Sequence, residues 1–192
     1  RRRRDLDLGR PPLPERRLVS RAIELDDVRK RFVVRSKRGR VRRERRVVDA
    51  VHGITLEIAE GELLGYLGPN GAGKSTTIKM LTGILVPSSG QVRVAGLDPA
   101  RRRIELARKI GVVFGQRVQL WWDLPLRDSF DLLRHVYRVP KQRYEENLAR
   151  FTELLELEPF LGMPVRQLSL GQRVRGDLSA ALLHDPEVVF LD

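Results

Sequence analysis

The sequence of 192 residues contains no cysteine, and aromatic residues make up only 6% of it. Without cysteine the chain can form neither disulfides nor thiolate metal sites, which fits a reducing compartment. Its longest apolar runs are a handful of residues, far short of the roughly 20 that a membrane span requires. The three histidines, His52, His135 and His184, are scattered singly, and we expect none of them to bind a metal. These absences leave a folded domain without disulfides, membrane spans or a histidine–cysteine metal centre.

The net charge of +12 comes entirely from the first quarter of the chain. Residues 1–46 hold 19 of the 37 Lys and Arg and 7 of the 25 Asp and Glu, whereas residues 47–192 hold 18 of each. Residues 1–20 combine arginines and prolines with few apolar residues, so we expect a disordered basic arm. The stretch 35–46 is expected to be a solvated hairpin loop, and its contact with an anionic membrane or with nucleic acid remains an alternative. The balanced remainder predicts no specific nucleic-acid partner.

A glycine-rich loop organises the rest of the chain. It matches G-x-x-x-x-G-K-[ST], and it comprises Gly68, Pro69, Asn70, Gly71, Ala72, Gly73, Lys74, Ser75 and Thr76. The apolar residues 62–67 in front of it predict a buried strand, and the pattern behind it predicts a helix that Gly83 closes. A strand–loop–helix unit of this kind is what the motif requires.

The loop has the chemistry of a phosphate cradle. Its glycines let the backbone approach a phosphate and present N–H groups, and the helix N-terminus adds its positive end. Lys74 is expected to reach the β- and γ-phosphates. The Ser75 hydroxyl is a suitable ligand for Mg²⁺, which prefers oxygen. We therefore expect the loop to hold the phosphates of a bound ligand together with Mg²⁺.

The remaining pattern is that of an α/β domain. Strands are expected at residues 22–28, 47–58, 91–96 and 110–114, and a helix at 99–109. Apolar residues repeat at three and four positions between 125 and 162, which predicts two or three short helices. A last helix follows from Gly171, and residues 187–192 read as a strand buried on both faces. Asp192 ends that strand, at the edge of a parallel sheet where ligands bind, so it is a candidate for orienting the magnesium shell.

With these residues in view, the chain resembles the nucleotide-binding subunit of an ATP-binding cassette transporter. Four motifs stand in that family's order: the Walker A loop 68–76, the glutamine loop at Gln116, the signature 168–172, and the Walker B strand 188–192. The resemblance implies a P-loop NTPase core with a parallel sheet, a small antiparallel β subdomain and an inserted helical subdomain. We expect this domain to span 21–192, with the helical subdomain at about 125–175, and to stop at the Walker B strand.

The resemblance also implies roles for individual residues. Ser169, Gly171 and Gln172 of the signature would contact the ATP held by a second cassette in a head-to-tail homodimer. Phe32 would stack on adenine, although an ordinary core aromatic is an equal alternative. Gln116 would contact magnesium and sense the membrane subunit. Lys74, Gln116 and Asp192 would be the catalytic set.

Two departures from the family pattern bear on activity. Leu170 stands where the signature usually has glycine, which alters one backbone contact to the partner's nucleotide. The family continues past Asp192 with a glutamate that polarises the attacking water and later with a histidine, and neither is in the 192 residues. We expect this stretch to belong to a longer protein and to bind Mg·ATP better than it hydrolyses it.

The form of the signature and the segment 119–125 resemble one bacterial branch, the cassettes of daunorubicin-resistance and viologen exporters. That branch implies an ATPase at the cytoplasmic face of the membrane, powering export of a drug-like molecule through a separate integral membrane permease. Trp121 and Trp122 would dock that permease, unless one is core and the other an unrelated surface residue. Two other functions remain open: a cassette acting on nucleic acid or ribosomes, and an ATP-binding module without turnover.

Overall fold

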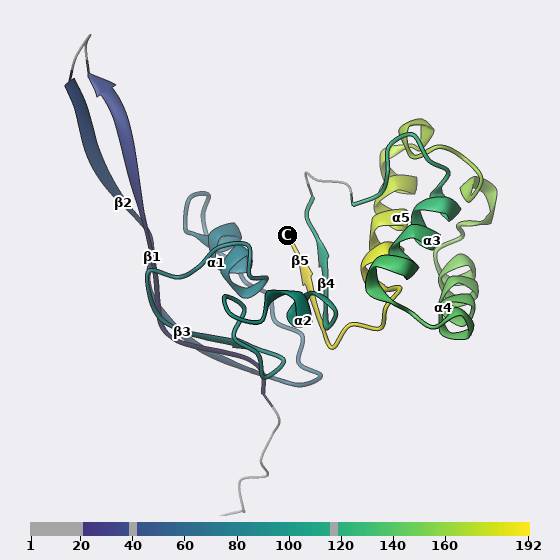
Figure 1. Ribbon diagram of the computed structural model, residues 1–192, viewed down its shortest axis with the longest axis horizontal. Helices are drawn as coiled ribbons and strands as arrows, with labels where there is room; N and C mark the ends of the chain where they lie inside the picture. Colours follow the sequence, from purple (N-terminus) through teal and green to yellow (C-terminus); the bar gives the residue numbers. More distant parts are fainter. Residues whose placement is uncertain (1–20, 39–41, 116–118) are drawn as a thin grey trace, which may run out of the picture.

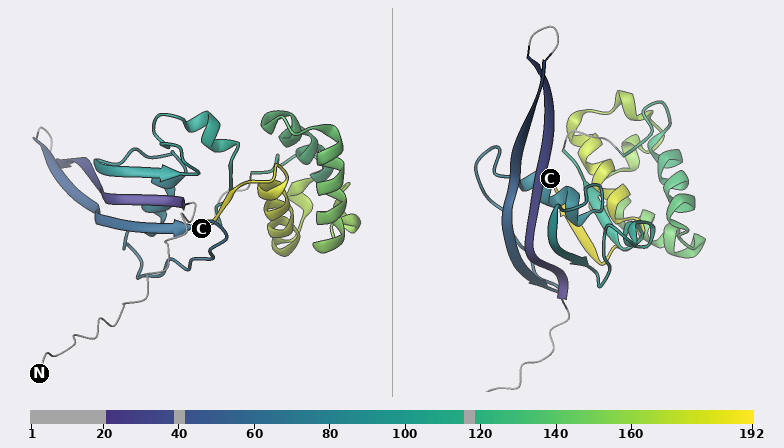
Figure 2. Two further views of the ribbon diagram at one scale, coloured as in Figure 1. Left: turned by 90° about the horizontal axis from the view of Figure 1, so that it is seen from below. Right: turned by 60° about the vertical axis from the view of Figure 1, so that its left-hand side comes forward.

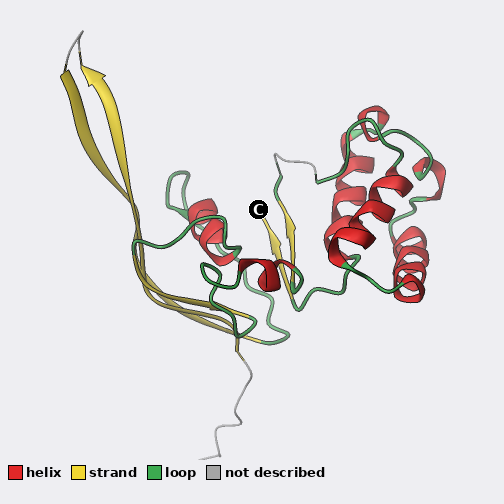
Figure 3. Cartoon of the chain, viewed as in Figure 1, coloured by secondary structure: helices red, strands yellow, loops and turns green. Residues whose placement is uncertain are grey.

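The computed structural model describes residues 21–38, 42–115 and 119–192. Figure 1 and Figure 3 show two groups of elements, one built mainly of strands and the other of helices, with a short pair of strands between them. Residues 1–20, for which disorder was predicted, lie outside the described part. Among the helices that are described, none has the length and apolar character to cross a bilayer.

The strand group is an antiparallel sheet in the order β2-β1-β3. Its strands are β1 (Arg21–Arg38), β2 (Arg42–Ala59) and β3 (Ser89–Val94). Leu25 of β1 lies between Leu56 of β2 and Val92 of β3. Alternate residues of the central strand face the core, because side chains of a strand alternate between its two faces. The small antiparallel β subdomain expected from the sequence is therefore present.

The basic stretch 35–46 is not the loop that its composition suggested. β1 continues to Arg38 and β2 begins at Arg42, so most of this stretch is paired strand. The register runs without a bulge from Arg31↔Asp49 to Arg38↔Arg42. Each added residue pair extends a strand ladder whose register is already set. The stretch therefore pairs as strand despite its polar composition.

The parallel pair consists of β4 (Ile110–Val113) and β5 (Val188–Leu191). A short helix, α2 (Arg103–Ala107), precedes β4, and it is shorter than the helix expected at 99–109. Phe190 of β5 is buried, but Leu191 is 66% exposed. The expectation that β5 is buried on both faces was wrong, because β5 pairs only with β4 among the described strands.

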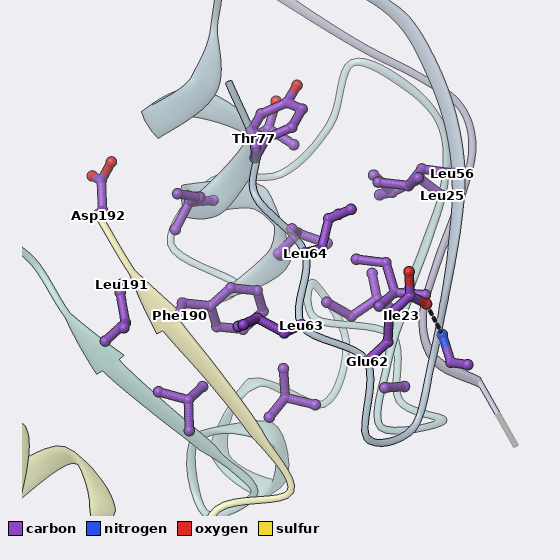
Figure 4. Close-up of a pocket in the computed structure, with 18 of the residues that line it drawn as sticks. Ile23, Leu25, Leu56, Glu62, Leu63, Leu64, Thr77, Phe190, Leu191 and Asp192 are labelled. Atoms are coloured by element: carbon purple, nitrogen blue, oxygen red, sulfur yellow. Dashed lines mark hydrogen bonds between the residues drawn. The ribbon is translucent and has the colours of Figure 1, made fainter. Parts of the chain in front are cut away.

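The segment in front of the glycine-rich loop is also not the strand that was predicted. Residues 63–69 have no regular structure, and Leu63 and Leu67 are 98% and 91% exposed. A buried strand needs a paired edge and packed faces, and this segment pairs with no described strand. A cavity of about 620 Å³ lies between it, the inner face of the sheet and β5. Figure 4 shows Leu63, Leu64 and Phe190 at this cavity.

The helical group confirms the helices expected between 125 and 162. It contains α3 (Leu126–Tyr137), α4 (Lys141–Leu154), two 3₁₀ turns at Glu158–Phe160 and Val165–Gln167, and α5 (Leu170–Leu182). Pro140 directly precedes α4, and Pro159 lies in the first 3₁₀ turn. Proline fixes φ and lacks an N–H, so it tends to begin a helical turn and interrupts a longer one.

Each group of elements has its own hydrophobic core. The left view of Figure 2 shows the two groups lying apart. The first core joins the sheet to α1 (Lys74–Leu81), α2, β4 and β5, and the second joins α3, α4 and α5. Large, fully buried side chains in the first are Val28, Met80, Val94 and Leu106, and in the second Leu126, Phe130, Leu157, Phe160 and Leu183. The β4–β5 pair connects these two packed units.

Candidate functional site

The glycine-rich loop folds tightly over the N-terminus of α1. Gly71 and Gly73 have φ of 84° and 85°, in the left-handed region that favours glycine. A Cβ on Gly73 would collide with the carbonyl oxygen of Ala50 in β2, so the loop packs directly on the sheet backbone. The carbonyl of Gly73 accepts the N–H of Thr77 at 2.8 Å, which begins α1. The predicted loop-to-helix junction is confirmed.

Lys74 lies folded back over the loop. Its ammonium donates hydrogen bonds to the carbonyl oxygens of Gly68 at 2.6 Å and Pro69 at 2.9 Å, and its side chain is half-buried. A positive charge is therefore held at the mouth of the loop. An anion bound there would compete with these two carbonyl groups for the ammonium.

Ser75 and Asp192 meet although 117 residues separate them. The Ser75 hydroxyl donates to Oδ1 of Asp192 at 2.9 Å. The β4–β5 ladder holds Asp192 in place, because its N–H donates to the carbonyl of Val113 and its carbonyl accepts the N–H of Gly115. A hydroxyl and a carboxylate oxygen thus lie together at the N-terminus of α1.

This donor set fits Mg²⁺ bound together with phosphate. Mg²⁺ takes six oxygen ligands and usually receives only one or two from carboxylates, the rest coming from water and phosphate. Across residues 21–38, 42–115 and 119–192 there is no cluster of three His, Cys, Asp or Glu that could hold a metal alone. Ser75 and Asp192 would accordingly hold the ion only in company with a bound phosphate.

Gln116, the glutamine expected to sense this site, lies outside the described residues, so its role stays a prediction. Its neighbour Gly115 is described, and it contacts the backbone of Asp192. Gly115, the last described residue before Gln116, therefore lies directly beside Asp192.

Phe32 lies on β1 opposite Val48, close to the strand residues on which the loop packs. The ammonium of Lys30 sits 5.1 Å from the centre of its ring. The side chain is half-buried and belongs to neither hydrophobic core. Stacking of its ring on a base remains a prediction.

The signature residues form the N-terminus of α5 through a capping box. Ser169 Oγ accepts the N–H of Gln172, and Oε1 of Gln172 accepts the N–H of Ser169 at 2.8 Å. First-turn N–H groups have no acceptor within a helix, so those of Leu170 and Gly171 point outward from this end. Both residues are exposed, and open space surrounds the position where Gly171 would carry a Cβ.

One chain does not bring the signature to the glycine-rich loop. Figures 1 and 2 place α1 beside the antiparallel sheet and α5 in the helical group, with β4 and β5 between them. The two predicted phosphate-binding ends, that of α1 and that of α5, are therefore separate surfaces of the molecule.

Sequence reasoning missed a carboxylate that ties α5 to the segment after the glutamine loop. Oδ1 of Asp177 accepts the N–H of Gln119 at 3.1 Å, and burial raises the pKa of this carboxyl group. The sequence did offer a signal for this contact, because Asp177 is an acidic residue between Gly176 and Ala180. All three lie on the buried face of α5. Gly176 lacks a side chain where Leu120 and Leu126 approach.

The two tryptophans lie on the surface of the same segment. Trp121 and Trp122 are 41% and 47% exposed, so neither is a core residue. The guanidinium of Arg173 stacks 4.6 Å from the ring centre of Trp122, and the carbonyl of Trp122 accepts the N–H of Arg166. The indole of Trp122 is consequently held beside α5.

Comparison with known proteins identifies one family. The family model described as ABC transporter matches residues 51–192. The chain is 36% identical over 143 residues to the daunorubicin resistance ATP-binding protein DrrA3 of Streptomyces coeruleorubidus, covering 74% of the chain and 45% of that protein. It is 40% identical over 152 residues to the methionine import ATP-binding protein MetN of Geobacillus kaustophilus, covering 76% and 43%. The chain thus spans less than half the length of these two relatives.

A solved structure agrees with this match. An ATP-binding cassette in a dimeric post-hydrolysis state, bound to ADP and Pi, superposes with a TM-score of 0.70 at 27% identity. The alignment covers 88% of the chain and 73% of that structure. The α/β fold expected from the sequence, with its P-loop, β subdomain and helical subdomain, is thereby confirmed.

Proposed function

The chain belongs to the ABC transporter family, and we propose on that basis that it is the ATP-binding and ATP-hydrolysing part of a transporter. The observation that carries the proposal is the hydrogen bond between Ser75 and Asp192 beside a glycine-rich loop closed by Lys74. A cation, a hydroxyl, a carboxylate and a helix N-terminus converge there, which suits a triphosphate with its metal.

Different residues hold different parts of the nucleotide and its metal. The N–H groups of the loop and of the first turn of α1 bind the phosphates, while Lys74 exchanges the carbonyls of Gly68 and Pro69 for the β- and γ-phosphates. Ser75 and Asp192 would hold Mg²⁺, which neutralises charge on the phosphates when bound. Phosphoryl transfer relies mainly on such positioning and charge stabilisation. Gln116, as the group that would sense the metal, belongs to the same proposal.

The proposal is tested by measuring ATP affinity of a Lys74→Ala variant by equilibrium dialysis. Loss of charge-assisted hydrogen bonds to phosphate should weaken binding about ten- to a hundredfold. Lys79→Ala is the matched control, because Lys79 is an exposed lysine in the last turn of the same helix. Unchanged affinity in Lys74→Ala would rule out this loop as the phosphate site.

We further propose that a second copy of the chain completes the site. Ser169, Gly171 and Gln172 would approach the γ-phosphate bound to the partner's loop, in a head-to-tail dimer. The separation of α5 from α1 within one chain supports this arrangement, as does the outward-facing end of α5. A dimeric solved relative bound to ADP and Pi has the same fold.

For the transported molecule we propose export of a drug-like or other hydrophobic compound through a separate membrane permease, from the cytoplasmic face of a bacterial membrane. The similarity to a daunorubicin resistance protein supports export, whereas the similarity to a methionine import protein supports the opposite direction. The exposed Trp121–Trp122 pair supports a docked partner, since aromatic residues are enriched at the centres of interfaces. Drug accumulation in cells with and without the full-length protein decides the direction. Export predicts higher accumulation in the deletion strain.

A further inference from the structure

The outer part of the β1–β2 hairpin, beyond Phe32, has no role in the site described above. We call residues 33–38 and 42–48 the hairpin arm. β3 pairs with β1 only as far as Arg29, so among the described strands none pairs with the arm from outside the hairpin. Figures 1 and 2 show it extending beyond the rest of the sheet and away from the helical group. A two-stranded hairpin is marginally stable in water, so a long one that projects from the fold indicates a use for its surface.

An apolar belt crosses the base of the arm. Val33 lies opposite Val47, and Val34 and Val48 are their neighbours along the strands. All four valines are exposed, from 39% for Val48 to 50% for Val47. Side chains alternate between the faces of a strand, so Val33 and Val47 lie on one face and Val34 and Val48 on the other. Single exposed valines are ordinary, but here each face of a projecting hairpin carries two, and water solvates them poorly.

Beyond this belt the register sets cations against cations. Arg35 lies opposite Arg45, Lys37 opposite Arg43, and Arg38 opposite Arg42. Like charges in directly opposed positions of an antiparallel pair destabilise it. The paired residues 33–38 and 42–47 include seven Lys and Arg and a single acidic residue, Glu44. The arm therefore combines exposed valines with a strong excess of positive charge.

This combination fits a lipid surface better than a nucleic acid. Cations next to exposed apolar side chains bind the headgroups of anionic lipids while the apolar groups enter the boundary with the acyl chains. Nucleic-acid recognition draws on amide side chains for base edges and on aromatic stacking. Between Arg31 and Asp49 there is no Asn, Gln, Tyr or Trp, and Phe32 already stacks with Lys30.

We propose that the hairpin arm binds the surface of an anionic lipid bilayer, with its arginines and lysine on the phosphate headgroups and Val33 and Val47 at the headgroup–acyl boundary. Binding relieves the repulsion between the opposed cations, because lipid phosphates lie between them. The contact is independent of the nucleotide site and places the chain at a membrane even without a protein partner.

The test is cosedimentation of the full 192-residue chain with phosphatidylcholine vesicles, with and without phosphatidylserine. We expect binding only to the anionic vesicles, and weaker binding at high salt. A variant with Arg35→Gln, Lys37→Gln, Arg43→Gln and Arg45→Gln should lose at least about a hundredfold in affinity, since each cation near an anionic surface contributes about fivefold. The matched control changes four exposed arginines elsewhere, Arg93, Arg103, Arg108 and Arg138, to Gln.

Residues 1–20 are the same in both variants, so their charge cannot explain a difference between them. If the four-fold arm variant were unfolded, its thermal midpoint would be lower. If it stays folded, removal of the opposed charges should leave the midpoint equal or higher. A Val33→Thr/Val47→Thr variant keeps β-branched strand residues and should weaken vesicle binding several-fold without changing ATP affinity. If the arm variant and the control lose vesicle binding equally, the proposal is overturned. Arm-dependent binding to a short DNA duplex without binding to anionic vesicles also overturns it, in favour of nucleic acid.

Discussion

At the scale of single residues, Gly73 shows how the loop depends on the sheet beneath it. Its φ of 85° is in the left-handed region, and a Cβ would collide with the carbonyl of Ala50. We expect Gly73→Ala to lower the free energy of unfolding by about 2 kcal/mol, from backbone strain and displacement of the loop. The same change should weaken ATP binding at least tenfold.

Urea unfolding midpoints and ATP titrations measure both effects. Gly61→Ala is the matched control, because Gly61 also has a positive φ of 76° but open space where the Cβ would stand. It should cost only about 1 kcal/mol, for the left-handed backbone, and leave ATP affinity unchanged. Equal effects of the two changes would show that the collision with Ala50 does not matter.

At the scale of one element, α5 uses Ser169 both to cap itself and, as proposed, to face a nucleotide. A Ser169→Asp substitution separates the two roles. Aspartate is an equally good N-cap and suits the positive end of the helix, so the unfolding midpoint should be retained. Its negative charge would repel the γ-phosphate on a partner chain, so dimerisation induced by Mg·ATP should be lost.

Ser169→Ala gives the complementary result. Loss of the cap should lower the free energy of unfolding by about 1 kcal/mol. It should weaken the nucleotide-induced dimer less than Ser169→Asp does, because alanine does not repel an anion. Sedimentation velocity with and without Mg·ATP measures the dimer. A Ser169→Asp chain that dimerises normally would contradict the proposed role of the signature.

At the scale of the whole molecule, the segment after the glutamine loop connects two separate cores. Asp192 and Gly115 lie together on the side of the phosphate loop, while Gln119 is tied to Asp177 and Trp122 to Arg173 on the side of α5. The position suits a docking surface for the proposed permease.

We therefore expect Trp122→Ala to reduce recovery of the permease with the full-length protein at least tenfold, since buried tryptophans are frequent hot spots of interfaces. ATP affinity of the isolated chain should not change. Ile104→Ala is the control, because Ile104 is an exposed apolar residue on α2, far from the tryptophans along the chain. Full recovery with Trp122→Ala would place the permease elsewhere.

The sequence by itself determined the parts that depend on local backbone chemistry. Gly71 and Gly73 adopt the left-handed conformations that the loop motif implies, Ser169 and Gln172 form a cap three residues apart, and proline marks the start of α4. Each of these features depends on residues within one turn or loop, so the spacing of residue types is sufficient to predict it.

The tertiary structure alone decided which distant residues meet and which strands find partners. Ser75 reaches Asp192 only because β5 pairs with β4 next to α1. The positions of the two residues in the sequence do not indicate how far apart their side chains lie. The basic stretch forms strand because its register continues from the inner part of the hairpin. The segment 62–67 does not form a strand, because no described strand pairs with it. Strand formation requires hydrogen bonds to another segment, and a sequence pattern states only the propensity to make them.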